Sequence, residues 1–474
     1  MSDFKGNSST VKEVGKKMGI FSVFCMATGT IVGAGVFGTI PVATGLVGTG
    51  LAWAYVFAFL TVLFRDMPNV LTTSVIPAPY APYKHVSRLV NPSSGFLMVV
   101  YAFNYILILS SLATVFAEYI GVYIPLDPRI LGIAALVIFA FITCKGAAAN
   151  AAVQNVMVVL LICALLMFIY KGTPKMSSEL VSISKVVAPE NLSIAAFGAA
   201  VAILSQSLQG AVDCTAYTDE IKNPGKTIPI CFVLSTGATL ILFIAVGIVC
   251  LGILPAEKFS SVKDAAALVL SSSQILYFII AGAVFAILTS LNGIYIASAH
   301  KIAAAAEDKV LPAWFANKNK ANVSSHSVIV FAAGASAIVA FGLPIGTLFS
   351  AFSFLVILCG MFILIPTTRV HKAYPHSYKH SYFKLTPSII KVVCTLGFFI
   401  SIWTLISLIQ TLDAMITIVI AVWIALFYLY FFLRKAYLKK QGIDLYELMS
   451  TPYPAWVEQE AKYAAMDAAE KQQK

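Results

Sequence analysis

Long runs of apolar residues dominate the sequence and limit what it can fold into. Apolar side chains make up 59% of the 474 residues and charged side chains 11%, whereas soluble domains have about 45–50% and about 25%. A helix that crosses a bilayer needs about 20 mostly apolar residues. The runs here lack the alternation of polar and apolar residues that a membrane barrel strand would show. The sequence therefore predicts an all-α membrane protein.

Twelve apolar runs are predicted to span the membrane. They cover residues 18–42, 50–75, 95–121, 129–145, 149–171, 193–217, 228–254, 275–303, 327–343, 347–366, 388–410 and 414–433. Because the number is even, both ends of the chain are expected on the same side of the membrane.

The distribution of basic residues predicts the orientation of the spans. With both termini inside, 26 Lys and Arg residues fall on the inner side and 6 on the outer side, and an excess of basic residues marks cytoplasmic segments. The net charge of +11 is therefore mainly a sign of topology, and no basic domain points to a nucleic-acid partner. In the inner loop before the eleventh span, His371, His376 and His380 have no acidic neighbour within the loop and are expected to be solvated.

Glycines are concentrated in the first span, in the stretch GTIVGAGVFG from Gly29 to Gly38. The stretch contains G-x-G-x-x-G, but a dinucleotide loop needs a preceding strand and an acidic residue about 20 positions on. Here the glycines lie within an apolar span and the next acidic residue is Asp66, so no cofactor is expected. Two uses remain open: close helix packing through Gly29-xxx-Gly33, or a break in the helix that exposes backbone groups to a ligand.

Polar residues are concentrated in the sixth span, in the stretch SQSLQGAVD from Ser205 to Asp213. Such groups are costly in hydrocarbon unless they line a cavity or pair with one another. The first and sixth spans would be corresponding members of two five-helix halves, the pattern of transporters whose substrate site lies between two broken helices. Three roles are open for Asp213: it receives a cationic group or a proton, it faces the inner vestibule, or it pairs with a neighbouring side chain.

Three separated motifs carry a family resemblance. They are GTIVGAGVFGTIP (Gly29–Pro41), EIKNPGKTIP (Glu220–Pro229) and AEDKVLPAWF (Ala306–Phe315), and a fourth, weaker one begins with SRL at Ser87. Together they resemble the amino acid–polyamine–organocation superfamily of permeases over roughly residues 15–435.

The resemblance implies a leucine-transporter-like fold of twelve helices, in which a 5+5 inverted repeat with broken first and sixth helices is followed by two extra helices. The expected organisation is a cytoplasmic N-terminus (1–17), a transporter domain (18–433) and a cytoplasmic tail (434–474). Within the transporter domain, the first repeat would cover 18–171, the second 193–366, and the last two helices 388–433.

The resemblance also implies a site for an amino acid. The backbone amides of Ala34 and Gly35 would bind the substrate carboxylate, and helix termini favour anions for electrostatic reasons. Carbonyls at Ile31, Gln206 and Gln209 would bind the ammonium group. The whole expected set is Thr30, Ile31, Gly33, Ala34, Gly35, Gln206, Ser207, Gln209, Gly210, Ser110 and Asn292, with Asp213 as a charge-coupling candidate. Interhelical hydrogen bonding is an alternative role for Ser110 and Asn292, and no metal ligand or catalytic residue is expected.

The expected function is secondary active transport of amino acids, or closely related amines, across the cytoplasmic membrane by alternating access. Leu161 lies where proton-coupled relatives carry a lysine, which favours exchange, with proton symport as the alternative. A membrane sensor of amino acids is an alternative from another class. An enzyme is not expected, since the chain lacks HExxH and GxSxG. The expected partners are the substrate and the lipid bilayer, and a homodimer is left open.

Overall fold

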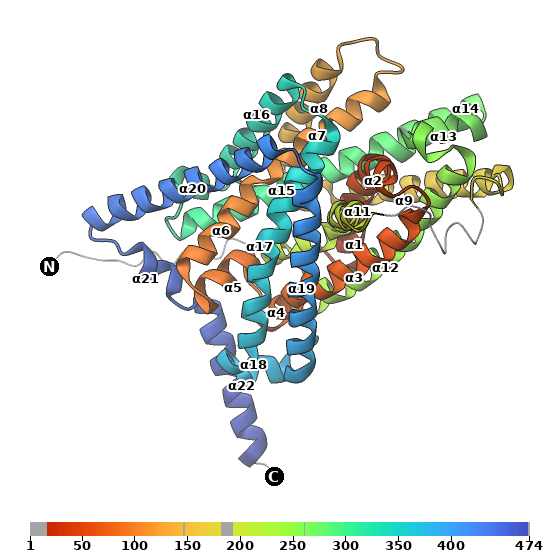
Figure 1. The fold of residues 1–474 in the computed structure, drawn as a ribbon. Helices are drawn as coiled ribbons and strands as arrows, with labels where there is room; N and C mark the ends of the chain where they lie inside the picture. The colour runs from red at the N-terminus through yellow and green to blue at the C-terminus, as the bar shows by residue number, and fades with distance from the viewer. Residues whose placement is uncertain (1–16, 146, 182–192, 260, 473–474) are drawn as a thin grey trace.

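The computed structural model of the chain describes residues 17–145, 147–181, 193–259 and 261–472. These residues form a bundle of helices (Figure 1), and within them the only extended pairing is an isolated bridge between Met18 and Ile221. Residues 1–16, most of the predicted N-terminal segment, lie outside the described ranges.

The helices of the first part of the chain, as far as residue 216, correspond to the first six predicted spans and their connections. They are α1 (Ile20–Val32), the π-helical η1 (Gly33–Thr39), α2 (Ile40–Val47), η2 (Gly48–Gly50), α3 (Leu51–Arg65), α4 (Met67–Val75), α5 (Ala81–Leu89), α6 (Pro92–Phe103), α7 (Tyr105–Ile120), α8 (Pro128–Thr143), α9 (Ala147–Gly172), η3 (Thr173–Lys175), α11 (Ile194–Ser207) and η4 (Gln209–Ala216).

The remaining helices include two near the C-terminus that follow the last predicted span. They are η5 (Thr218–Glu220), α12 (Pro224–Ile253), η6 (Ala256–Lys258), α13 (Val262–Val269), α14 (Ser272–Tyr277), the π-helical η7 (Phe278–Val284), α15 (Phe285–Glu307), η8 (Ala313–Ala316), α16 (Ser325–Phe341), α17 (Ile345–Ala373), α18 (Pro375–His380), α19 (Pro387–Thr411), α20 (Ala414–Lys440), α21 (Leu445–Ser450) and α22 (Pro454–Gln472).

All twelve predicted runs coincide with helical segments, but not all of these segments are long enough to count as spans on their own. Among the described residues, eight helical stretches are long and apolar enough to cross a membrane, or nine if the bent pair α11 and η4 is one span. One of the eight, Ile20–Val75, contains the first two predicted spans, whereas α8 and α16 are shorter. The all-helical membrane fold is therefore confirmed, while twelve spans and the inverted repeat stay predictions.

The interruptions of the first and sixth spans take different forms. The prediction that the first span is broken is wrong, because its backbone stays helical throughout. It passes from α1 to the π-helical η1 and on to α2, and Gly33 keeps helical angles (φ −62°, ψ −51°). Such π-segments widen a helix without unwinding it. The sixth span is bent by 47° between α11 and η4, where the helix tightens to a 3-10 form.

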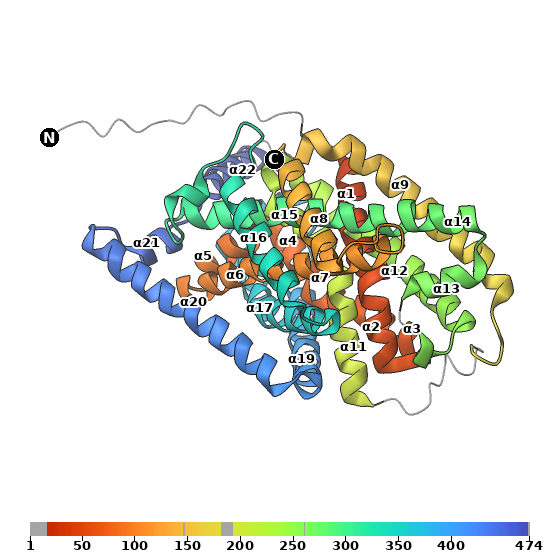
Figure 2. The same ribbon diagram turned by 90° about the horizontal axis from the view of Figure 1, so that it is seen from above.

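The long helices pack side by side around a buried interior, and one of them lies at the edge. Helices α17 and α19 run next to each other, and α20 lies along the outside of the bundle (Figures 1 and 2). Many large apolar side chains of α20 are exposed, including Ile418, Val422 and Leu426. A lipid-facing helix is expected to have such a surface.

Residues of the recognised motifs meet in buried ion pairs. Arg88, of the SRL motif, lies 2.9 Å from Asp308 of the AEDKVLPAWF motif. Glu220, which begins the EIKNPGKTIP motif, lies 2.8 Å from His300 on α15. These motif residues therefore join helices that are distant in the sequence.

The last helix, α22, docks against the end of the bundle where α4 and α18 lie (Figure 1). The indole Nε1 of Trp456, a fully buried residue, donates to the carbonyl of Pro77 at 2.9 Å, and Gln459 donates to the carbonyl of Val75 at 2.7 Å. The carboxylate of Asp467 lies 2.5 Å from Lys379, 2.7 Å from His376 and 2.9 Å from His380. The prediction of solvated histidines is thus wrong for His376 and His380, because their acidic partner lies in the tail and not in their own loop.

We expect Asp467→Asn to loosen the docked tail. Hydrogen bonds from His376, Lys379 and His380 hold the pKa of Asp467 well below its usual range. Its contribution to docking is therefore complete above pH ~4, the value for an unfolded aspartate, and is lost as the pH falls from there toward the folded pKa. Hydrogen exchange of residues 454–472 at neutral pH should be faster in the variant than in the native chain. The exposed Glu458 provides the control, and equal exchange in Asp467→Asn and Glu458→Gln would contradict the prediction.

Candidate functional site

A central cavity lies beside the bend of the sixth span. It is lined by residues from five predicted spans, the first, third, sixth, eighth and tenth: Thr30, Thr39, Tyr105, Ile108, Gln206, Ser207, Gln209, Gly210, Asp213, Ile294, Phe349 and Phe352. The volume open to water is about 30 Å³, enough for about two water molecules. The cavity is therefore too small for an amino acid in this structure, and a larger ligand requires the lining to move apart.

Half of the predicted site residues line this cavity. They are Thr30, Gln206, Ser207, Gln209, Gly210 and Asp213. The lining residues that the sequence analysis did not identify are Thr39, Tyr105, Ile108, Ile294, Phe349 and Phe352. The last two lie three positions apart on α17, a spacing that puts them on one face of a helix. The spacing alone does not show that this face points to a cavity.

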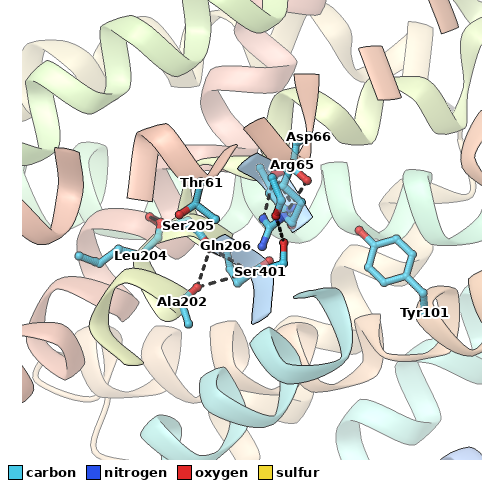
Figure 3. Close-up of polar contacts among 12 residues, drawn as sticks. Thr61, Arg65, Asp66, Tyr101, Ala202, Leu204, Ser205, Gln206 and Ser401 are labelled. Atoms are coloured by element: carbon cyan, nitrogen blue, oxygen red, sulfur yellow. Dashed lines mark hydrogen bonds and ion pairs between the residues drawn. The ribbon is translucent and has the colours of Figure 1, made fainter. Parts of the chain in front are cut away.

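Gln206 lies in the last turn of α11, just before the bend, and its side chain has one hydrogen-bonding atom without a partner among the described residues. Its Nε2 donates to the hydroxyl of Ser205 at 3.2 Å and to the carbonyl of Ala202 at 3.5 Å (Figure 3). Its Oε1 is buried and has no hydrogen-bond partner among the described residues. A buried acceptor without a partner is unfavourable, so this oxygen is available to a donor that enters the cavity.

The second part of the bent helix is held through Gln209. Its Nε2 donates to Asp66 at 2.8 Å, and Asp66 forms a buried ion pair with Arg65, also at 2.8 Å (Figure 3 shows the pair). The carboxylate of Asp66 thus has partners from the second and the sixth spans.

The first-span glycines act mainly as packing residues in this structure. A Cβ atom at Gly33 would lie 2.2 Å from the carbonyl oxygen of Ala286 on α15, and one at Gly35 would lie 2.3 Å from the ring of Phe243 on α12. Of the two uses left open by the sequence, the structure therefore shows close helix contact. Among the described residues, Ile31, Gly33 and Gly35 are not part of the cavity lining, and the side chain of Ala34 is not among those that the structure describes.

Two further predicted residues form interhelical hydrogen bonds instead of lining the cavity. The hydroxyl of Ser110 lies 3.3 Å from the carbonyl oxygen of Ala335 on α16, an interhelical hydrogen bond, and 2.7 Å from that of Ile106 within its own helix α7. The amide of Asn292 donates to Gln154 on α9 at 3.3 Å. The alternative role considered for Ser110 and Asn292 is the one that the structure shows.

Asp213 pairs with a lysine from the eighth span. Its Oδ1 accepts hydrogen bonds from Lys301 Nζ at 2.8 Å and from the hydroxyl of Tyr105 at 2.5 Å. Lys301 is buried on α15. Of the roles left open for Asp213, pairing with a neighbouring side chain is thus present.

Comparison with known proteins identifies the family. A family profile described as amino acid permease matches residues 18–433. The chain belongs to the amino acid permease family. This permease is therefore a member of the amino acid–polyamine–organocation superfamily and a transporter of amino acids, not an enzyme.

Two known proteins match the permease at low sequence identity. The permease is 24% identical over 316 residues to an uncharacterized protein, MJ0609, of Methanocaldococcus jannaschii, with 64% of this chain and 71% of that protein covered. It is 23% identical over 301 residues to the branched-chain amino acid permease BcaP of Bacillus subtilis. That match covers 57% of this chain and 62% of BcaP, so it spans less than two thirds of that protein.

We expect Gly33→Ala to destabilise the permease. The added methyl group would press on the carbonyl of Ala286, a backbone atom that cannot turn away, and overpacking of this kind costs about 1–3 kcal/mol. The matched control is Gly237→Ala within α12, where a Cβ atom meets nothing within 4 Å. Thermal unfolding of both purified variants measures the effect. A midpoint for Gly33→Ala as high as that of Gly237→Ala would show that the contact is not tight.

Proposed function

We propose that this permease carries amino acids across the cell membrane by alternating access and exchanges one for another. The observation that carries the proposal is the central cavity at the bend of the sixth span, with the unpartnered oxygen of Gln206 buried in its wall. A substrate ammonium group is a donor of the kind that this oxygen lacks.

The backbone amides of Ala34 and Gly35 remain the proposed donors to the substrate carboxylate. They lie in η1, which also contributes Thr39 to the cavity wall. Because Gly35 packs against Phe243, this role requires η1 to rearrange when the cavity expands around a substrate. The change from α-helix to π-helix at this segment is consistent with such a rearrangement, since π-segments occur often at functional sites.

An apolar amino acid is the proposed substrate. Ile108, Ile294, Phe349 and Phe352 contribute side chains to the cavity wall, and pockets with apolar walls and few polar groups suit ligands with an apolar part. BcaP is named a branched-chain amino acid permease, and branched-chain amino acids are apolar. This name supports the same substrate class for the present permease.

Exchange is proposed in preference to proton symport because the side chains of the fifth span that face the first and eighth spans are uncharged. There Gln154 of α9 donates to the carbonyl of Thr289 at 3.3 Å, and Leu161 is fully buried. A neutral amide binds no proton at physiological pH. Among the side chains of α9 that the structure describes, the position where proton-coupled relatives carry a lysine is occupied by Leu161, which does not titrate.

The proposed location is the cytoplasmic membrane, with both termini on the cytoplasmic side, as the distribution of basic residues predicts. The exposed apolar surface of α20 suits contact with lipid or with a second copy of the chain. The proposal therefore does not choose between a monomer and a homodimer.

Uptake into proteoliposomes tests the proposed function. We expect labelled leucine or isoleucine to accumulate in vesicles loaded with unlabelled amino acid and not in empty vesicles, because an exchanger needs a substrate for the return step. Accumulation in empty vesicles driven by a proton gradient would replace exchange by symport. No accumulation in either kind of vesicle would favour a sensor that binds without transport.

Gln206→Leu tests the proposed ligand contact. The substitution keeps a similar volume and removes the amide oxygen, and a hydrogen bond to a charged group contributes about 1.5–3 kcal/mol. We therefore expect the KM for uptake to rise about 10- to 100-fold. The control is Gln410→Leu on α19, where the side chain is exposed. An unchanged KM in Gln206→Leu, with uptake intact, would remove this residue from the site.

A further inference from the structure

We propose that Lys301 is a built-in ammonium group that occupies a cation site beside the central cavity, so that the permease accepts neutral amino acids and excludes cationic ones. The part of this inference that concerns substrates rests on the proposed function. The cation site itself can be tested without any transport.

Asp213 lines two neighbouring cavities. It contributes to the wall of the central cavity and also to that of a second cavity, which is lined in addition by Asp66, Tyr101, Gln209 and Lys301 among others. A carboxylate with no partner in this position would attract a cationic side chain or an amine.

Lys301 already supplies that cation. Its Nζ lies 2.8 Å from Asp213 Oδ1, and the side chains of the two residues are 3% and 12% exposed. The hydroxyl of Tyr105 donates to the same oxygen. The charge of Asp213 is therefore compensated from within the chain.

The ammonium group of Lys301 is also surrounded by aromatic rings. Its Nζ lies 3.5 Å from the ring centroid of Tyr105, 5.0 Å from that of Tyr101 and 6.0 Å from that of Tyr80. Aromatic faces within about 6 Å attract cations, and cages of such rings recognise alkylammonium ligands. One carboxylate and three rings thus form a complete recognition site for an alkylammonium ion, and Lys301 fills it.

The other carboxylate at the cavities is compensated in the same way. Asp66 lies 2.8 Å from Arg65 and accepts a hydrogen bond from Gln209. With both carboxylates paired, the described residues of the two cavity walls include no unpaired carboxylate. A cationic side chain would instead meet the ammonium group of Lys301, and like charges in a buried site repel.

Removal of Lys301 should turn the filled site into one that binds an added cation. Lys301→Ala deletes the part of the side chain that corresponds to n-propylammonium. In the purified variant we expect n-propylammonium chloride to raise the thermal unfolding midpoint by ~2 °C or more in a saturable way, because a ligand that binds the folded state stabilises it. Uncharged n-propanol and sodium chloride of equal ionic strength are the matched additives.

The native chain and the double variant Asp213→Asn/Lys301→Ala provide the comparison, because one keeps the site filled and the other lacks the carboxylate. We expect neither to respond to n-propylammonium. The same shift in all three proteins, or no shift in Lys301→Ala, would overturn the proposal.

Competition experiments test the consequence for substrates and use the native chain alone. In the native permease we expect excess leucine to inhibit uptake of labelled isoleucine, and excess ornithine or arginine to leave it unchanged. Inhibition by ornithine as strong as that by leucine would overturn the exclusion of cations. If isoleucine itself is not taken up, the proposed function fails, and the stabilisation of Lys301→Ala by n-propylammonium still decides whether the cation site exists.

Discussion

Two buried ion pairs connect the eighth span to the sixth span and to the short segment that follows it, and they hold together the part of the molecule that surrounds the cavity. His300 and Lys301 are consecutive on α15, and they pair with Glu220 and Asp213, at 2.8 Å in each case. Asp213 lies in η4 and Glu220 in η5. A bent helix loses part of its regular backbone bonding, and in hydrocarbon the groups involved must find partners within the protein. The segment after the bend is therefore fixed to its neighbour at two points.

The first span completes this unit by approaching the other two spans at glycines. A Cβ atom at Gly210 would lie 2.8 Å from the backbone nitrogen of Ile31, and one at Gly293 would lie 2.2 Å from the hydroxyl of Thr30. The hydroxyl of Ser290 on α15 also donates to the carbonyls of Gly29 and Thr30, at 2.8 and 2.9 Å. Glycine costs helix stability, and here it allows three spans to meet at backbone distance around one cavity. Any opening of the cavity has to move these spans as a unit or separate the buried partners.

The all-helical membrane fold class and several polar residues of the cavity wall could be predicted from the sequence, because burial of amides and hydroxyls in an apolar run has few physical explanations. Gln206, Ser207 and Gln209 line the cavity for that reason. The role of Gly33 could not be decided, since the same spacing serves a break and a close contact. The partner of Asp213 could not be found either: Lys301 is 88 positions away, and their contact depends on how two helices are rotated. For His376, the acidic partner Asp467 lies in a separate helix, which analysis of the loop alone cannot reveal.

The pairing of both cavity carboxylates has a consequence for how a zwitterion can be held. With Asp66 and Asp213 each compensated by a basic residue, the cavity-lining groups that we propose as substrate contacts are uncharged: the oxygen of Gln206 and the hydroxyls of Thr30 and Ser207. An ion pair between the substrate and a buried protein charge is hard to separate in a low dielectric. Uncharged dipoles bind a charged substrate group less strongly, and no unpaired protein charge stays buried when the substrate leaves. A carrier has to release its substrate as well as bind it. Internal ion pairs thus connect the helices around the cavity, and in the proposed function the uncharged groups bind the amino acid reversibly.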